Sequence, residues 1–210
     1  MHHANLIWIT PNAEQLIAKI ARVSNPSNED NPNYEKLIRY LIKHRHWSPF
    51  EMASMCVEIK TTRAIAAQIL RHRSFSFQEF SQRYAEPLGD FPFEIPNLRS
   101  QDKSNRQNSI DDLDDDVVKR HKGRISELFE ESKRVYDLMI ADGIAKECAR
   151  SVLPLNTETR LYMSGTLRSW LHYVDLRGDN GTQREHMDVA RAIGEIIDTE
   201  VPSVARAMWG

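Results

Sequence analysis

Glycine is scarce in this sequence, with eight residues among 210, and no glycine-rich phosphate loop can be found. The absence of GxGxxG and GxxxxGK[ST] excludes the dinucleotide fingerprint of Rossmann folds and the P-loop of nucleotide hydrolases. HExxH and paired CxxC motifs are also absent, so we expect no metal site. If a nucleotide binds, arginine side chains must do what backbone amides do in those folds.

Cysteine is equally rare, and the two residues present, Cys56 and Cys148, lie far apart in the sequence. Without a signal-peptide pattern, this usage predicts reduced thiols and a cytoplasmic location. No apolar run approaches the length of a membrane span. The 28 basic and 30 acidic residues give a net charge of -2, so no overall positive field favours nucleic acid or a membrane surface.

Hydrophobic periodicity predicts a chain with more helices than strands. A length of 210 residues, 40% of them hydrophobic, is sufficient for one catalytic domain, which we expect to span 1–210. Strands are expected at 6–9, 55–60 and 158–163. Helices are expected at 10–24, 34–44, 63–72, 166–176 and 182–199, and two more lie between 116 and 152: a long one that begins near 116 and a further one that ends near 152. Because strands and helices do not alternate regularly, we predict an α+β fold, a mixed, helix-rich domain with a small central sheet.

The segment 87–116 breaks this periodicity. Three prolines are followed by a polar, acid-rich stretch, which predicts a loop or insertion. Asp115 and Asp116 suit the positive N-terminus of a long amphipathic helix that follows. The stripe that this helix is expected to bury consists of Val118, Ile125, Leu128, Phe129, Ser132, Val135, Tyr136 and Met139.

The most informative segment is 71–84, which begins Arg71-His72-Arg73 and continues to Ser81 and Arg83. Guanidinium groups match phosphate oxygens in pairs, so clustering them beside serine and glutamine predicts a site for a phosphorylated ligand, which we infer to be a nucleotide. The competing interpretation is a solvated helix end, where cations complement the negative end of the helix dipole.

Five segments of the sequence occur together in one known family. Arg71-His72-Arg73, seven residues and then Ser81 resembles the RHRx7S signature of flavin-dependent thymidylate synthases. Four further parts are similar to elements of that family in the same order: 46–51 (HWSPFE), 68–71 (QILR), 149–154 (ARSVLP), and the late residues Arg168, His172 and Arg177.

The resemblance implies an FAD-dependent enzyme that methylates dUMP to dTMP. Methylenetetrahydrofolate would donate the carbon and NADPH would reduce the flavin, in a homotetramer whose sites are shared between subunits. The family uses no cysteine nucleophile, which suits the absence of an obvious activating base beside Cys56 or Cys148 in this sequence.

The resemblance also implies individual roles. Arg177 and Ser81 are the catalytic candidates: Arg177 would stabilise negative charge on the uracil, and Ser81 would position the ligand rather than attack it. The residues expected at dUMP are Gln68, Ile69, Leu70, Arg71, Glu79, Phe80, Ser81, Gln82, Arg83, Arg150 and Arg177. Those expected at FAD are Ser48, Arg71, His72, Arg73, Glu79, Thr166, Arg168 and His172, with His46 near the folate or flavin.

Three positions depart from the family pattern: Gln78 and Thr166 each replace a frequent asparagine, and Gly181 replaces a frequent histidine.

Two alternative interpretations stay open at the sequence level. Ser48 to Glu51 also reads as a helix capping box. The segment 71–84, rich in arginine and phenylalanine, could instead form a module that binds single-stranded nucleic acid, gripping phosphates and stacking bases.

Overall fold

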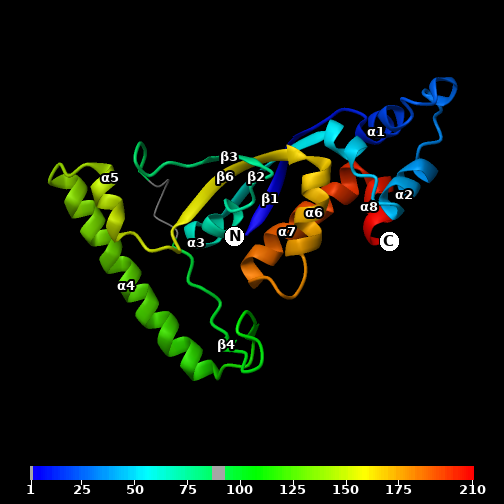
Figure 1. Ribbon diagram of the computed structural model, residues 1–210. Helices are drawn as coiled ribbons and strands as arrows, with labels where there is room; N and C mark the ends of the chain where they lie inside the picture. Colours follow the sequence, from blue (N-terminus) through cyan, green and yellow to red (C-terminus); the bar gives the residue numbers. More distant parts are fainter. Residues whose placement is uncertain (1, 87–92) are drawn as a thin grey trace.

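A computed structural model describes residues 2–86 and 93–210, and its centre is a four-stranded antiparallel sheet with strand order β1-β2-β6-β3 (Figure 1). The strands are β1 (His3–Ile9), β2 (Ser54–Thr62), β6 (Glu158–Thr166) and β3 (Ser76–Glu79). Every second side chain of β2, at Met55, Val57 and Ile59, is fully buried, as the alternation in the sequence predicts. The predicted α+β class, with a small central sheet, is confirmed.

Helices cover one side of this sheet and continue beyond its end. They are α1 (Ala13–Ala21), α2 (Glu35–Lys43), α3 (Arg63–Ile69), α6 (Leu167–Arg177), α7 (Arg184–Glu200) and α8 (Pro202–Trp209). Trp170 of α6 is fully buried, and its indole N–H donates to the Met55 carbonyl oxygen at 3.0 Å. The core also contains Val189, Ile193 and Ile197 of α7, and burying each such side chain contributes about 1.5–3 kcal/mol.

Two strand-to-helix junctions place the candidate site. The long strands β2 and β6 each run directly into a helix, and a threonine caps that helix. The Thr62 hydroxyl accepts from the Ile65 N–H at the start of α3, and the Thr166 hydroxyl accepts from the Ser169 N–H at the start of α6. Because β2 and β6 are antiparallel, with Thr62 opposite Glu158, α3 and α6 begin at opposite ends of this strand pair.

Gly165 allows the beginning of β3 to pack closely on β6. A Cβ atom at this position would lie 2.5 Å from the Phe75 ring, so no other residue fits without displacing that ring. Phe75 in turn packs edge-on against Trp170, with ring centroids 4.6 Å apart. The turn that carries Arg71 to Arg73 is therefore fixed to the core immediately before β3.

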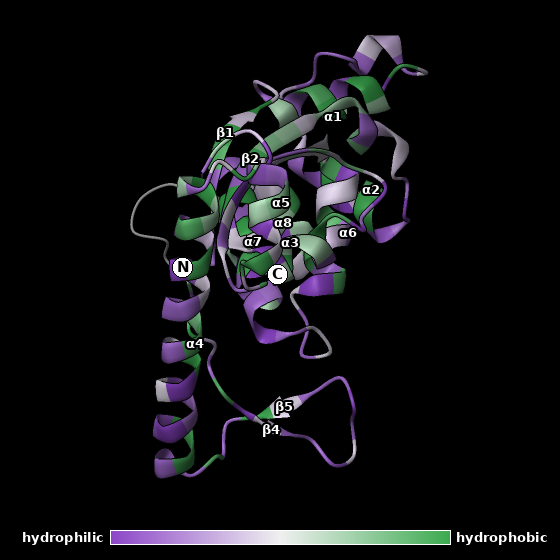
Figure 2. Cartoon of the chain, turned by 90° about the vertical axis from the view of Figure 1, so that its left-hand side faces the viewer, coloured by the Kyte–Doolittle hydropathy of each residue, from purple (hydrophilic) through white to green (hydrophobic). Residues whose placement is uncertain are grey.

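Helix α4 (Asp115–Ala141) projects away from the sheet, beside the small hairpin of β4 (Ser100–Gln101) and β5 (Ser109–Ile110) (Figures 1 and 2). Asp114 caps α4, with Asp115 and Asp116 in its first turn, as predicted. Of the predicted buried stripe, only Tyr136 is fully buried, and Leu128 is 64% exposed, so this prediction is wrong for the chain alone. The chain itself covers only the last turns of this stripe, where Tyr136 and Met139 pack against Phe93 and residues of 149–153.

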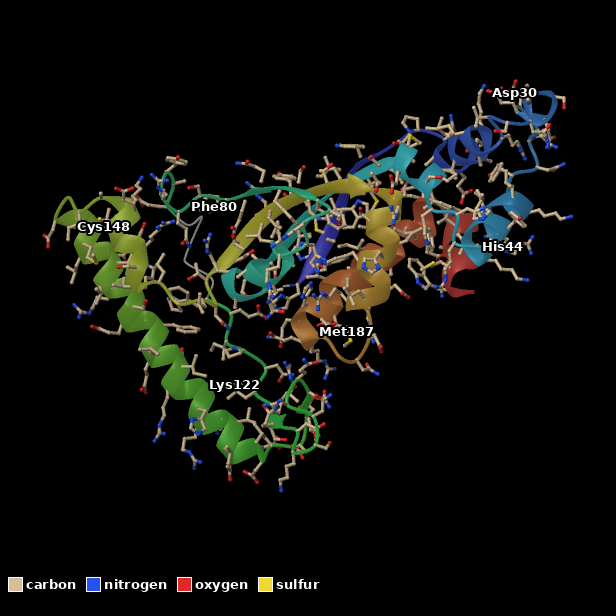
Figure 3. All side chains as sticks on the ribbon, viewed as in Figure 1. Asp30, His44, Phe80, Lys122, Cys148 and Met187 are labelled. Atoms are coloured by element: carbon tan, nitrogen blue, oxygen red, sulfur yellow. The ribbon has the colours of Figure 1, made fainter. Side chains whose placement is uncertain are left out.

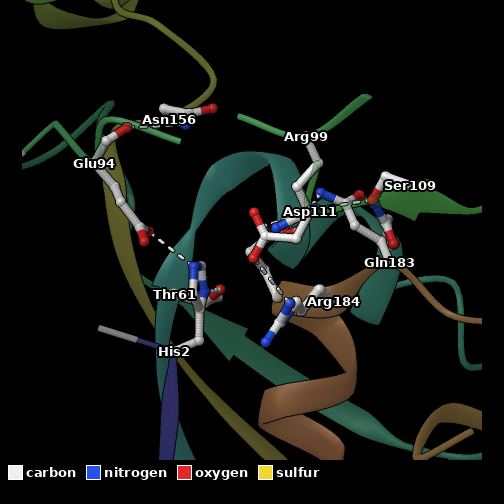
Figure 4. A network of polar contacts seen from close by, with 11 residues as sticks. His2, Thr61, Glu94, Arg99, Ser109, Asp111, Asn156, Gln183 and Arg184 are labelled. Atoms are coloured by element: carbon white, nitrogen blue, oxygen red, sulfur yellow. Dashed lines mark hydrogen bonds and ion pairs between the residues drawn. The ribbon is translucent and has the colours of Figure 1, made fainter. Parts of the chain in front are cut away.

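The described residues at 93–94 of the predicted loop 87–116 contact residues beside the sheet. Residues 87–92 lie outside the described part, whereas Phe93 forms a bridge with Thr157. The carboxylate of Glu94 pairs with the His2 ring at 2.8 Å (Figure 4). The loop prediction missed the β4–β5 hairpin that follows. The single-domain organisation stays a prediction.

Two further predictions differ from the structure. Ser48–Met52 forms a 3-10 helix after Trp47 with no capping side chain, so the capping box is wrong. The helix predicted to end near 152 is only α5 (Lys146–Ala149), extended by a 3-10 turn at Arg150–Val152. Helix α8 was not predicted. In the described residues no helix is both long and apolar enough to cross a membrane, and the cytoplasmic location stays a prediction.

Candidate functional site

The segment 71–84 contains the edge strand β3, so its two charged halves lie at opposite ends of that strand. Arg71 to Arg73 precede the strand, and Ser81 to Arg83 follow it. At about 3.3 Å per residue, a four-residue strand separates the two groups by at least about 10 Å. A single chain therefore presents the basic motif as two separate sets of donors.

At the first end, Arg177 is held by a neutral histidine. Its Nε donates to His72 Nε2 at 3.1 Å, which requires that nitrogen to carry no proton. Burial lowers the pKa of His72 to about 4, helped by the positive charges of Arg177, His172 and Arg71. Because the acceptor is uncharged, the interaction orients the guanidinium of Arg177 without neutralising it.

Gln68 lies beside this pair in the last turn of α3. Its Nε2 donates to Gln183 Oε1 at 2.7 Å, and its Oε1 lies 3.3 Å from His186 Nδ1. Ile69 is fully buried in the core, whereas Leu70 is partly exposed at the end of the helix. Arg71 and Arg73 are exposed, and neither guanidinium has an ion-pair partner in residues 2–86 and 93–210.

A cavity of about 590 Å³ opens where α6 begins, and three predicted flavin residues line it: Thr166, Arg168 and His172. Trp47 and Ser74 also line this cavity, and Arg168 forms an ion pair with Glu51. A cation, several hydroxyls and an indole face suit a ligand that carries both phosphates and aromatic rings. Ser48 and His46 are exposed on the neighbouring segment.

The second end of β3 forms a separate cavity of about 400 Å³ with α5, lined by Gln82, Arg150 and Arg63. Gln82 is 5% exposed, and its Nε2 has no hydrogen-bond partner in the described residues. An unpartnered buried amide costs stability, so a ligand oxygen at this position would compensate it. Arg83 pairs with Glu147 at 3.4 Å, and Figure 3 shows Phe80 on the same side as Cys148, far from His44.

Glu79 and Phe80 lie where β3 meets α3. The Glu79 carboxylate pairs with Arg63 at 3.1 Å and accepts from the Thr159 hydroxyl at 2.9 Å. The Ser81 hydroxyl accepts from the Arg83 N–H at 3.4 Å, a local contact. The predicted nucleotide residues are thus divided between this end and the Arg177 end.

Comparison with known proteins identifies the chain. A profile of the family described as "Thymidylate synthase complementing protein" matches residues 5–203. The chain is 53% identical to a flavin-dependent thymidylate synthase from Synechocystis over 195 residues, which is 93% of this chain and 89% of the relative. The chain belongs to the flavin-dependent thymidylate synthase family.

More distant flavin-dependent thymidylate synthases agree. The enzyme of Thermus thermophilus is 35% identical over 190 residues, covering 90% of this chain and 69% of the relative. Among solved structures, a UMP/dUMP methylase from Streptomyces cacaoi bound with 5-Br dUMP superposes with a TM-score of 0.85 at 28% identity. That comparison covers 99% of this chain and 94% of the methylase.

Sequence reasoning missed two buried polar residues at the Arg177 end of this flavin-dependent thymidylate synthase, Tyr173 and His186. His186 occupies the apolar stripe of α7 that continues through Val189 and Ile193. A single histidine on an otherwise apolar stripe is the signal that could have identified it.

The acidic run near 111–116 has a structural role, since Asp114 caps α4. In residues 2–86 and 93–210, no group of three or more potential metal ligands occurs.

The half-buried His72 and the buried His186 predict acid-sensitive folding. Burial, followed by the charge of Arg177, lowers the pKa of His186 to about 4, and that of His72 is similarly low. Between about 4 and the ordinary value of 6.5, the unfolded chain binds protons that the folded chain does not. The contribution of these two histidines to the free energy of unfolding should therefore be fully present above about pH 6.5 and decline as the pH falls towards 4.

Denaturant unfolding at a series of pH values measures this decline. Because carboxylates titrate over part of the same range, the informative quantity is the difference between wild type and His186→Phe. The variant should show a shallower loss of stability on acidification. Parallel curves for the two proteins would contradict the assignment.

Neither cysteine should be required for catalysis. Cys56 is 8% exposed on β2, and burial raises the pKa of its thiol, which disfavours the nucleophilic thiolate. Cys148 is exposed on α5, beside Glu147. The double variant Cys56→Ala and Cys148→Ala should retain measurable turnover. A folded double variant with no dTMP formation would revive covalent catalysis through sulfur.

Proposed function

We propose that the protein methylates dUMP to dTMP, with methylenetetrahydrofolate as the carbon donor and FAD, reduced by NADPH, as the hydride source. Family membership and the methylase neighbour support this reaction. The observation in the fold that carries it is Arg177, whose charge is oriented by a neutral His72 acceptor. When bound, FAD supplies the hydride that completes formation of the methyl group.

The cavity at the start of α6 is proposed to hold part of FAD. Arg168 would pair with a phosphate, exchanging its Glu51 partner for the ligand, while Thr166 and His172 line the same space. Ser48, Arg71, His72, Arg73 and Glu79 complete the proposed flavin set. His46 is proposed near the folate or flavin, because it belongs to an exposed aromatic group with Tyr40 and His44.

The nucleotide is proposed to bind where both ends of β3 contribute. Ser81, Gln82, Arg83 and Arg150 would hold the phosphate and orient the base, with Gln82 gaining the partner that it lacks. Gln68, Ile69, Leu70, Arg71, Glu79, Phe80 and Arg177 form the rest of the proposed set. A guanidinium against the uracil edge would stabilise negative charge there and favour nucleophilic attack by carbon 5.

This division supports a homotetramer in which each site combines residues of different subunits. The two donor sets lie at opposite ends of a strand, and in the proposed assembly a neighbouring subunit supplies one of them to each nucleotide site. Exposed apolar side chains suit contact between subunits: Ile7 and Trp8 on the edge strand β1, and Leu128 and Leu138 on α4.

The alternative, a module that binds single-stranded nucleic acid, has no support from the comparisons. Phe75 and Phe77 pack against the core instead of offering free faces for bases, although Tyr84 is exposed.

The experiment that decides between the two functions combines spectroscopy and turnover. We expect purified protein to bind FAD with its visible absorbance and to form dTMP from dUMP, methylenetetrahydrofolate and NADPH. Colourless protein that cannot take up FAD and makes no dTMP would refute the proposal.

A further inference from the structure

A line of hydrogen bonds connects the interior of the helical layer to Gln68. Tyr173 of α6 lies 2.9 Å from His186 of α7, and both side chains are buried. His186 contacts Gln68, which donates to Gln183, and Gln183 Nε2 donates to the Glu185 carboxylate at 2.9 Å. These five residues form what we call the Gln68 network.

The direction of every hydrogen bond in the network is fixed by its charged end. Glu185 pairs with Arg99 at 2.8 Å (Figure 4 shows Arg99 beside Gln183), and an ionised carboxylate can only accept. Gln183 must therefore turn its amide nitrogen towards Glu185 and its oxygen towards Gln68. This arrangement leaves the Gln68 oxygen needing a donor.

His186 satisfies that need in one tautomer only. Its Nδ1 must carry the proton that Gln68 Oε1 accepts, so its Nε2 is bare and accepts from the Tyr173 hydroxyl. Burial raises the pKa of Tyr173, which keeps that hydroxyl protonated and able to donate. All of these roles agree, so the network holds the Gln68 amide in one orientation.

The same pair also supports the Arg177 end of the site. The Tyr173 ring packs edge-on against the His72 ring, with centroids 4.9 Å apart, and His72 accepts from Arg177. The buried Tyr173–His186 pair thus supports both residues that flank the proposed nucleotide position. His186 contacts Gln68 directly, and Tyr173 packs against His72, which holds Arg177.

We propose that Tyr173 and His186 are positioning residues for the pyrimidine nucleotide, because they fix the Gln68 amide in the orientation that the nucleotide meets. This inference rests on the proposed function, in which Gln68 contacts dUMP. Neither residue touches the ligand position itself, since both are buried. Their contribution should therefore appear as nucleotide affinity and leave flavin content unchanged.

The test measures dUMP binding by calorimetry on FAD-loaded protein, together with dTMP turnover. His186→Phe keeps the ring but removes both hydrogen bonds, and should raise the dissociation constant for dUMP about tenfold. Tyr173→Phe removes one oxygen and should raise it about threefold. KM for dUMP should follow these changes, with a smaller change in kcat.

Two further variants separate positioning from general stability. His186→Asn places an amide N–H near the original Nδ1–H, so it should recover much of the affinity that His186→Phe loses. Val189→Ala truncates the next buried position on the same face of α7. It should lower stability and leave the dissociation constant for dUMP at the wild-type value.

Each outcome decides the proposal. Wild-type affinity in folded His186→Phe and Tyr173→Phe would overturn it, as would equal weakening by Val189→Ala or no recovery in His186→Asn. If His186→Phe does not fold, the nearly isosteric Tyr173→Phe decides. A wild type that binds dUMP but forms no dTMP refutes the proposed function alone, whereas one that binds no dUMP refutes both.

Discussion

Replacing Arg177 by alanine should reduce dTMP turnover by about two orders of magnitude or more, while FAD stays bound. Arg177 lies in the last turn of α6, and its Nε donates a hydrogen bond to His72. No carboxylate pairs with its guanidinium in residues 2–86 and 93–210, so the positive charge stays available to the ligand. Removing a preorganised charge costs most when negative charge develops on the substrate.

Two matched variants define this effect. Arg177→Lys keeps the charge but loses the planar fork, so it should recover only part of the turnover. Arg191→Ala removes a nearby cation whose Nε donates to the Gly178 carbonyl oxygen, outside the proposed site, and should leave turnover close to wild type. Bound flavin is read from its visible absorbance in every sample. Near-normal turnover of Arg177→Ala would refute the proposed role.

Mixing two inactive variants should restore activity. Arg150→Ala removes a donor at one end of β3, and Arg177→Ala removes a donor at the other end. If each site takes Arg150 from one subunit and Arg177 from another, randomly mixed tetramers regain about a quarter of their sites intact. Turnover should rise from near zero to about a quarter of wild type after the subunits are exchanged by unfolding and refolding together.

The control is the double variant Arg150→Ala and Arg177→Ala refolded with Arg177→Ala. No chain in that mixture carries a native Arg177, so no site can be complete in either arrangement. If both arginines of a site came from the same chain, the first mixture would also stay inactive. That result, obtained with tetramers proven to be mixed, would exclude shared sites.

The sequence predicted the elements whose patterns are set locally. Alternation at Met55, Val57 and Ile59 identified β2, and helical spacing identified α6 and α7. Helix α8 was missed because Pro202 after α7 looks like a terminator, whereas it starts a new helix at a position where proline is favoured. Strand β3 was missed because four residues carry too little alternation to stand out.

The candidate site was predicted through the resemblance, and its division could not have been. Nothing in the order Arg71, Ser81, Arg177 reveals that β3 separates the first two while His72 joins the first segment to the third. The network of Tyr173, His186 and Gln68 depends on a contact between Gln68 and His186, which are 118 positions apart. Periodicity likewise indicated an apolar stripe on α4, but it cannot say what covers that stripe.

The most direct test of the whole account is a single turnover without oxygen. FAD-loaded protein is reduced and mixed with dUMP and methylenetetrahydrofolate, and flavin absorbance and dTMP are followed together. We predict that the flavin reoxidises only when both substrates are present, and that one dTMP forms for each flavin oxidised. Reoxidation without dTMP, or dTMP formation in protein stripped of flavin, would contradict the account.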